Sequence, residues 1–225
     1  MLKKIISGGQ TGADQAALDV AIKLDIPHGG WIPKGRKTEN GPLPEKYQLK
    51  EMSTANYPKR TKKNIMESDG TLILSHGGLS GGSALTQDYA DRVQRPCLHI
   101  NFNIANIFQA ALRVINWIQE NGIRVLNVAG PRASKDPKIY KATVDLLESV
   151  YHLDMIHDNI PDLGKPPSIP PRTIEEAIET LISELSLKDR ARIANMAEVE
   201  IDSLNVYLGR YIRDNFKIWA GNDSL

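Results

Sequence analysis

The sequence predicts an α/β protein in which a doubly wound parallel sheet is followed by a small C-terminal α-helical module. Three observations support this fold class. Short apolar runs alternate with amphipathic stretches up to about residue 155, two of these runs end in glycine clusters that open helices, and the composition changes near residue 160. Near-continuous apolar strands interleaved with helices are typical of parallel sheets covered on both faces.

The first strand ends at Ser7, and the glycine-rich segment Gly8-Gly9-Gln10-Thr11-Gly12 leads from it into an alanine-rich amphipathic helix. Such a loop directs backbone N–H groups and a helix N-terminus to one point, which favours phosphate or another oxyanion. We expect Gly8, Gly9, Thr11 and Gly12 to form an oxyanion cradle, with Gln10 among its residues. A tight turn that binds nothing is the alternative interpretation.

Asp14 lies in the first turn of this helix and has two interpretations. The helix dipole stabilises a carboxylate at this position, yet the carboxylate would repel an anion bound beside it. Asp14 is therefore either a cap that faces away from the site or an acceptor for an N–H or O–H group of the ligand.

A polar passage broken by proline and glycine follows, up to about Pro44. Long loops in compact domains are usually functional or mobile. Lys34 and Arg36, which flank Gly35, are expected to reach over an anion bound at the first turn, whereas Lys37 is expected on a solvated surface. A solvated loop is the alternative for all three.

A second strand–glycine–helix unit begins with the apolar run Thr71 to Ser75 and continues into a helix predicted over Leu85 to Val93. Gly81, Gly82 and Ser83 are expected to form a second cradle. Two such units in one chain favour a binding site over a pair of plain turns.

The remaining elements complete the alternation: a short helix over 57–68, strands over 97–100 and 124–129, and helices over 104–121 and 139–151. The loop after the last strand carries Arg132. Ligands of parallel sheets lie outside the carboxyl ends of the strands, so we expect the three loops to converge there. Arg60 and Arg132 rank above Lys34 as anion-binding cations, because arginine contacts oxyanions bidentately.

Composition excludes several classes of function. The formal net charge of +1 gives no reason to expect nucleic acid as the main partner. No run of about 18 apolar residues is present, and we expect a cytoplasmic protein with no membrane contact. The single cysteine, Cys97, excludes an intrachain disulfide and is expected to be a buried thiol. No motif points to a protein-bound metal or to a catalytic residue set.

We divide the chain into a nucleotide- or oxyanion-binding domain over 1–158, a proline-rich linker over 159–171 and a helical module over 172–225. Thr173 and Glu176 form a capping box that opens the first helix of this module. The module is too short to build a generous core alone, so we expect it to pack on the first domain or on a second copy of the chain. A homo-oligomer is therefore expected.

Several motifs together resemble the "putative molybdenum carrier" family, over about residues 1–155. They are Ser7 to Ala17, Gly30 to Arg36, Arg60-Thr61 with Asn64, Ser68 to Leu74, Gly81 to Thr86, and Leu126 to Arg132. The resemblance implies a Rossmann-like fold of the SLOG superfamily, which includes the Lonely Guy phosphoribohydrolases and binds nucleotides and their derivatives. It also implies molybdenum cofactor or a nucleotide as ligand. The tail is similar to a helical domain of unknown function.

The chain departs from the Lonely Guy pattern at Leu85, which stands where those hydrolases carry a catalytic glutamate. We therefore expect a carrier or sensor for a phosphate-bearing, nucleotide-like ligand rather than an enzyme. One alternative is a hydrolase or transferase acting on a nucleotide or ADP-ribose derivative, with Asp14, Asp69 or Asp88 as acid/base. Another is a scaffold whose helical tail binds a protein partner.

Overall fold

The computed structural model describes residues 2–157, 170–185, 187–195, 209, 212 and 216. The chain divides into two compact units, Met1–Tyr151 and His152–Leu225.

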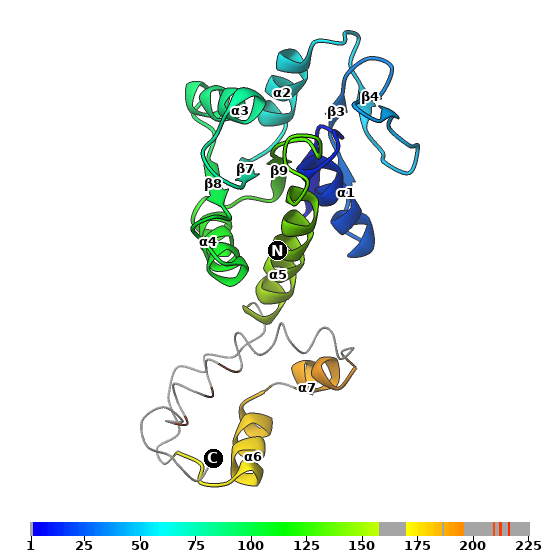
Figure 1. The fold of residues 1–225 in the computed structure, drawn as a ribbon. Helices are drawn as coiled ribbons and strands as arrows, with labels where there is room; N and C mark the ends of the chain where they lie inside the picture. The colour runs from blue at the N-terminus through cyan, green and yellow to red at the C-terminus, as the bar shows by residue number, and fades with distance from the viewer. Residues whose placement is uncertain are drawn as a thin grey trace. The chain divides into compact units, whose positions relative to one another are not determined.

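The first unit is built on a five-stranded parallel sheet with the strand order β2-β1-β9-β7-β8 (Figure 1). The strands are β1 (Lys4–Ser7), β2 (His28–Gly29), β7 (Gly70–Ser75), β8 (Cys97–Asn101) and β9 (Val125–Ala129). The last strand, β9, lies between β1 and β7, with Leu126 opposite Ile5 and Val128 opposite Leu72. The predicted parallel sheet is confirmed.

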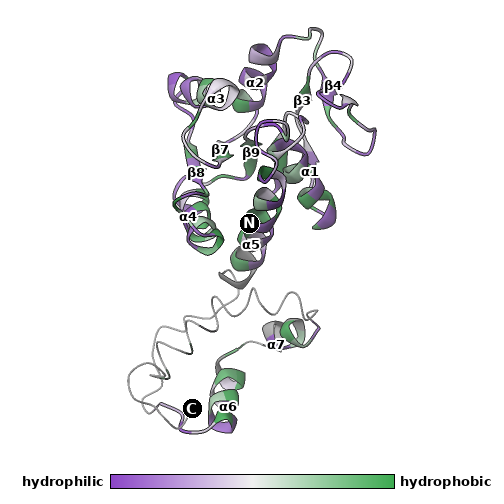
Figure 2. Cartoon of the chain, viewed as in Figure 1, coloured by the Kyte–Doolittle hydropathy of each residue, from purple (hydrophilic) through white to green (hydrophobic). Residues whose placement is uncertain are grey.

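The sheet's central strands form the core, because their side chains are apolar on both faces. Leu72, Ile73, Leu74, Leu126 and Val128 are fully buried, and Figure 2 colours β7 and β9 as hydrophobic. Burying a side chain of this size stabilises a fold by roughly 1.5–3 kcal/mol. The near-continuous apolar runs were the signal that predicted these strands.

Helices cover both faces of the sheet. They are α1 (Ala13–Lys23), α2 (Tyr57–Met66), α3 (Gly81–Arg92), α4 (Ile107–Glu120) and α5 (Ile139–His157). Figure 1 shows α2 and α3 on one side of the sheet and α1 and α4 on the other, with α5 beside them. The connections from β1 to β2 and from β7 to β8 run in opposite directions, so right-handed crossovers place α1 and α3 on opposite faces.

Helix α3 begins at Gly81, four residues earlier than the predicted start at Leu85. The N-cap is Ser80, whose carbonyl accepts from Ser83 N and Ala84 N at 3.2 and 3.4 Å. Gly81 has a φ of +51°, a left-handed conformation that favours glycine and turns the chain directly into the helix. The Gly-Gly pair argued against a helix in the sequence because glycine has low helix propensity.

The passage expected to be an irregular loop contains short paired strands. β3 (Trp31–Ile32) pairs with β6 (Lys50–Glu51), and β4 (Lys37–Thr38) forms an antiparallel hairpin with β5 (Gly41–Pro42). Ile32, Leu43 and Leu49 are buried in a cluster with Leu18 of α1 and Tyr47. This cluster fixes the base of the hairpin to the first unit.

In the second unit the structure describes α6 (Ile174–Glu184) and α7 (Leu187–Ala194). The predicted N-cap is confirmed, since Thr173 Oγ1 accepts from Glu176 N at 3.2 Å, but the Glu176 carboxylate accepts from Arg172 N at 2.7 Å, one residue before the N-cap N–H that a full capping box would use. The proline-rich linker and most of the tail beyond residue 195 lie outside the described residues. Among the described helices, none is long and apolar enough to cross a membrane.

Candidate functional site

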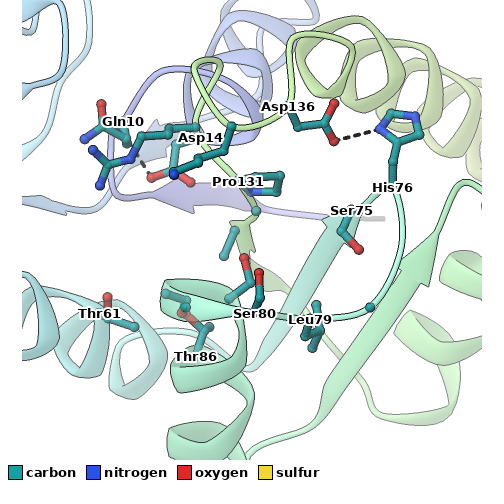
Figure 3. A pocket seen from close by; sticks show the side chains of 18 of the residues that line it. Gln10, Asp14, Thr61, Ser75, His76, Leu79, Ser80, Thr86, Pro131 and Asp136 are labelled. Carbon is teal, nitrogen blue, oxygen red and sulfur yellow. Dashed lines mark hydrogen bonds and ion pairs between the residues drawn. The ribbon is translucent and has the colours of Figure 1, made fainter.

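A cavity of about 1050 Å³ lies at the carboxyl ends of β1, β9 and β7 (Figure 3). Its lining residues come from four segments and from Asn103. The segments are the start of α1 (Gln10, Asp14), α2 (Tyr57, Arg60, Thr61), the end of β7 with the start of α3 (Ser75, His76, Gly78 to Ser83, Thr86), and the β9–α5 loop (Ala129 to Arg132, Lys135 to Lys138).

The sheet's topology explains the position of this cavity. The connection leaving β1 goes to one edge of the sheet, whereas the connection leaving β7 goes to the other. Loops that diverge in this way leave a crevice between them, which is where open α/β sheets bind ligands. The predicted convergence of three loops is therefore present in the fold.

The cavity brings together part of the predicted site. Gln10, Asp14, Arg60, Gly81, Gly82, Ser83 and Arg132 line it. Gly8, Gly9, Thr11, Gly12, Lys34 and Arg36 do not.

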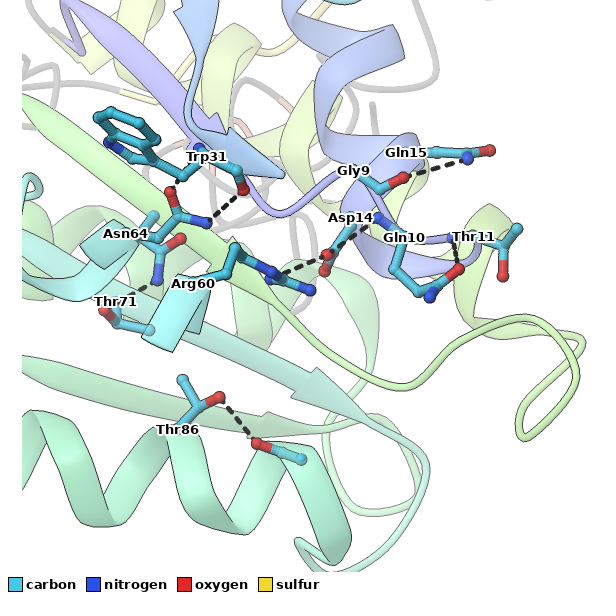
Figure 4. Close-up of polar contacts among 12 residues, drawn as sticks. Gly9, Gln10, Thr11, Asp14, Gln15, Trp31, Arg60, Asn64, Thr71 and Thr86 are labelled. Carbon is cyan, nitrogen blue, oxygen red and sulfur yellow. Dashed lines mark hydrogen bonds and ion pairs between the residues drawn. The ribbon is translucent and has the colours of Figure 1, made fainter. Parts of the chain in front are cut away.

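Two N–H groups of the first glycine-rich loop have side-chain acceptors within the protein (Figure 4). Gln10 N donates to Asp14 Oδ2 at 3.2 Å and Thr11 N to the Gln10 side-chain carbonyl at 3.0 Å, while Ala13 N, just after the loop, donates to Pro131 O at 3.4 Å. What the loop contributes to the cavity lining is the pair Gln10 and Asp14.

The glycines of this loop permit close approaches. Gly12 has a φ of +80°, and a Cβ there would lie 2.5 Å from Pro131 O. Gly8 lies against the Arg60 guanidinium, where a Cβ would be only 1.6 Å from Nη1. Gly12 thus brings the β9–α5 loop against the β1–α1 loop, and Gly8 leaves room for Arg60.

Arg36 and Lys34 have other surroundings. The Arg36 guanidinium donates to the carbonyls of Leu43, Pro44 and Tyr47 at 2.9–3.0 Å, and to that of Leu49 at 3.4 Å. Lys34 is exposed. Arg36 thus organises the polypeptide that follows it, a role that its sequence neighbours did not indicate.

Arg60 and Asp14 form a buried ion pair on one side of the cavity. Arg60 Nη1 lies 3.6 Å from Asp14 Oδ2, and the two side chains are only 13% and 7% exposed. Burial raises the pKa of the Asp14 carboxyl, although Arg60 and the N–H of Gln10 act in the opposite direction. Among the described residues Arg60 Nε has no hydrogen-bond partner and is covered by protein, so the part of the guanidinium that pairs with Asp14 is its Nη1.

Helix α2 holds Arg60 in place through Asn64, one turn further along. Asn64 Oδ1 accepts from Trp31 N at 2.8 Å, and its amide donates to Trp31 O at 3.2 Å (Figure 4). The helix is therefore fixed to β3, and Arg60 is directed over Gly8.

The start of α3 is the open side of the cavity. Ser83 N and Ala84 N bond to Ser80 O, whereas the N–H groups of Gly81 and Gly82 precede the first hydrogen-bonded turn. A Cβ at Gly81 or Gly82 would meet no atom within 4 Å. Arg132, Lys135 and Lys138 line the same cavity and supply positive charge for an anion.

His76 and Asp136 form a pair that the sequence did not reveal. His76 Nδ1 lies 2.8 Å from Asp136 Oδ2, and both residues line the cavity on the side away from Gln10 and Asp14 (Figure 3). Lys138 N donates to the other Asp136 oxygen at 3.1 Å, and the imidazole packs against the Phe102 ring at 5.3 Å. Position in the sequence could have indicated this pair, because His76 directly follows β7 and Asp136 lies in the loop after β9.

Glu39 was also missed. It lies between β4 and β5, and its carboxylate accepts from the Thr11 hydroxyl and from Ser134 Oγ, the latter at 2.5 Å. Arg132 Nε is 3.9 Å away. No local pattern predicts these contacts, because the partners are 28 and 95 residues away.

Cys97 and His99 lie in β8 and are not among the residues that line the cavity. Cys97 is half-buried, and burial raises the pKa of its thiol to about 12. His99 Nε2 lies 2.8 Å from Ser75 Oγ. Within the described residues, no group of three or more His, Cys, Asp or Glu side chains is arranged to hold a metal ion.

Residues 5–151 match the model of a family described as the circularly permutated YpsA SLOG family, and residues 170–225 match a domain of unknown function, DUF6794. Among solved structures, the chain is similar to the putative molybdenum carrier protein from Syntrophus aciditrophicus SB. The two share 60% identity with a TM-score of 0.66, over 66% of this chain and 94% of that one. No curated protein matches the chain.

Proposed function

Because the chain belongs to the circularly permutated YpsA SLOG family, we propose that its first unit is a carrier or sensor for a phosphate-bearing, nucleotide-like ligand. One observation carries this proposal: a single cavity holds the open start of α3, the three cations that line it beside Arg60, and the buried ion pair of Asp14 and Arg60. At about 1050 Å³ the cavity is slightly larger than most small-molecule sites, which measure about 300–1,000 Å³.

The two sides of the cavity suit different parts of such a ligand. The start of α3 with Arg132, Lys135 and Lys138 provides N–H groups and positive charge for a phosphate. Gln10, Asp14 and Arg60 provide acceptors and donors for a sugar, base or pterin. The solved relative is named a putative molybdenum carrier, so the molybdenum cofactor, a phosphate-bearing pterin, is a candidate beside nucleotides.

Calorimetric titration of the full chain with AMP, ADP-ribose and molybdopterin tests the proposal. We expect at least one of them to bind, and Arg132→Gln to weaken its binding about tenfold. Arg92→Gln is the matched control, because Arg92 is exposed in the last turn of α3 and does not line the cavity. If none of the three compounds binds the wild-type chain, the proposal fails.

A hydrolase acting on a nucleotide derivative is a second candidate, favoured by the His76–Asp136 pair. A carboxylate bonded to Nδ1 orients an imidazole and stabilises its protonated form, which is how general bases are commonly built. In this candidate, neutral His76 takes a proton from water. The water oxygen bonds to one phosphorus of a phosphoanhydride, and the bond from that phosphorus to the bridging oxygen breaks. The leaving phosphate departs as an anion, and the proton passes to solvent.

Of the three acids named as possible acid/base groups, Asp14 lines the cavity, whereas Asp69 and Asp88 do not. Asp69 Oδ2 accepts from Arg124 N and Val125 N at 3.0 and 2.7 Å, which places it at the start of β9, and Asp88 is exposed outside the cavity lining. Release of AMP from ADP-ribose is the assay. His76→Gln should abolish release and His28→Gln, outside the cavity, should not. Release at the level of buffer alone would exclude this candidate.

A further inference from the structure

Glu39 occupies a small anion site next to the cavity. Its side chain is 15% exposed. Glu39 Oε1 accepts from the Thr11 hydroxyl and from Ser134 N at 3.2 Å, and Oε2 accepts from Ser134 Oγ at 2.5 Å. With Arg132 Nε at 3.9 Å, the carboxylate has two hydroxyl donors, one N–H donor and one guanidinium around it.

These donors belong to the loops that frame the cavity and not to the hairpin that carries Glu39. Thr11 precedes α1, while Arg132 and Ser134 follow β9. Ala133 N donates to Thr11 Oγ1 at 3.2 Å, so the two loops are bonded to each other as well as to the carboxylate. Hydroxyl, N–H and guanidinium donors suit phosphate as well as carboxylate. The arrangement is therefore an oxyanion site assembled without any contribution from Glu39.

Arg132 connects this site to the cavity. Its side chain lines the cavity and is 45% exposed, while its Nε faces Glu39 Oε2. Partial burial raises the pKa of the Glu39 carboxyl, but the hydrogen bonds from Ser134 and Thr11 outweigh it and lower that pKa. At neutral pH the carboxylate thus stays ionised and shares Arg132 with any anion in the cavity.

The base of the β4–β5 hairpin is held to the unit by more contacts than its tip, so the tip can move away from the two loops without the base. The base is fixed by Leu43 in the core cluster and by the carbonyl bonds of Arg36. The tip residues Asn40 and Pro42 are exposed. Within the part of the chain that the structure describes, Glu39 makes the polar contacts of the tip with the rest of the unit, and its own N–H donates to Gln10 Oε1 at 2.9 Å.

We propose that Glu39 is an internal competitor, and that a phosphate group takes its place between Thr11, Arg132 and Ser134 when the tip of the hairpin moves away. For a ligand with a second phosphate, beside the one at the start of α3, this rests on the proposed function, but the site itself is tested with inorganic phosphate. A tethered group competes at an effective concentration in the millimolar range or above. The wild-type chain should therefore respond weakly to millimolar phosphate.

The experiment compares the thermal midpoint of the full chain, with and without inorganic phosphate, for wild type and Glu39→Ala. We expect Glu39→Ala to bind phosphate at least tenfold more tightly than wild type, and the added Ser134→Ala substitution to reverse this gain. Glu39→Gln, which keeps the size of the side chain, should gain affinity too and serves where Glu39→Ala folds poorly.

Glu45→Gln is the matched control for the change of charge. Glu45 lies in the same passage of the chain, is 90% exposed and is 3.6 Å from Arg36 Nε, outside the anion site. Equal phosphate responses of wild type, Glu39→Gln and Glu45→Gln would overturn the proposal and reduce Glu39 to a structural tie. Failure of AMP, ADP-ribose and molybdopterin to bind, with the phosphate gain intact, would instead overturn the proposed function alone.

Discussion

Replacing Gly82 by alanine should stabilise the chain and weaken ligand binding at the same time. Gly82 lies in the first turn of α3, and a Cβ there would meet no protein atom within 4 Å. Alanine is favoured over glycine in helices by roughly 0.5–1 kcal/mol. For a chain of this size that corresponds to a rise in the thermal midpoint of about 1–4 °C.

The added methyl group would occupy open space at the start of α3, where we propose that the phosphate binds. Loss of one hydrogen bond to a charged group costs about 1.5–3 kcal/mol, which is roughly a ten- to hundredfold loss of affinity. Scanning calorimetry without ligand measures the first effect, and titration with whichever of AMP, ADP-ribose or molybdopterin binds wild type measures the second.

Asp88→Ala is the control for this prediction, because it also raises the helix propensity of α3 but replaces an exposed residue outside the cavity. It should raise the midpoint without changing affinity. If Gly82→Ala binds the ligand as tightly as wild type, the phosphate is not held at the start of α3 and the reasoning is refuted.

Three further predictions concern stability. Gly12→Ala should destabilise the first unit by about 1–3 kcal/mol in denaturant titrations, because of the positive φ and the close Pro131 carbonyl; an unchanged midpoint would contradict this. Burial raises the pKa of the Asp14 carboxyl, so the folded chain binds this proton more tightly than the unfolded chain does. Asp14 therefore lowers the free energy of unfolding as pH rises from about 3.8, the ordinary pKa of the group, through its raised pKa in the folded chain. Asp14→Asn should remove this fall in melts across that range. The pKa of the Glu39 carboxyl is lowered in the folded chain, so its effect on stability has the opposite sign. Ionised Glu39 stabilises the fold above about pH 4.5, and this stabilisation is lost as pH falls through the lowered pKa. Glu39→Gln should therefore flatten the acid side of the stability curve, and Glu45→Gln should not.

The alternation of apolar runs and amphipathic stretches was sufficient to predict α1 to α5, four of the five parallel strands and the meeting of their carboxyl ends. It did not predict β2, because a strand of two residues leaves no apolar run in the sequence. The place of β9 between β1 and β7 was not predictable, because strand order depends on crossovers between segments more than 50 residues apart. The helix start at Gly81 was missed because the positive φ that permits it is a property of the folded turn.

Within the site, the sequence indicated which loops line the cavity, but not which of their side chains point into it. Arg36 and Arg60 are both flanked by basic or small residues, yet one binds backbone carbonyls and the other faces Asp14. Side-chain direction in irregular segments depends on distant partners, as the 60-residue separation of His76 and Asp136 also illustrates. The glycine pattern of the first loop indicated a close approach, but whether of a ligand or of another loop was decided by Pro131.

The insertion of β9 between β1 and β7 also sets a length. Neighbouring strands lie about 4.7–4.9 Å apart, so the ends of β1 and β7 are separated by two such spacings, roughly 9–10 Å. A molecule that touches Asp14 after β1 and the start of α3 after β7 must span about that distance. A free phosphate is too short to bridge the two loops, whereas a phosphate joined through a sugar or a pterin side chain to a ring system has the necessary reach. The strand order thus sets a minimum length for any ligand that contacts both loops, whichever side chains then bind it.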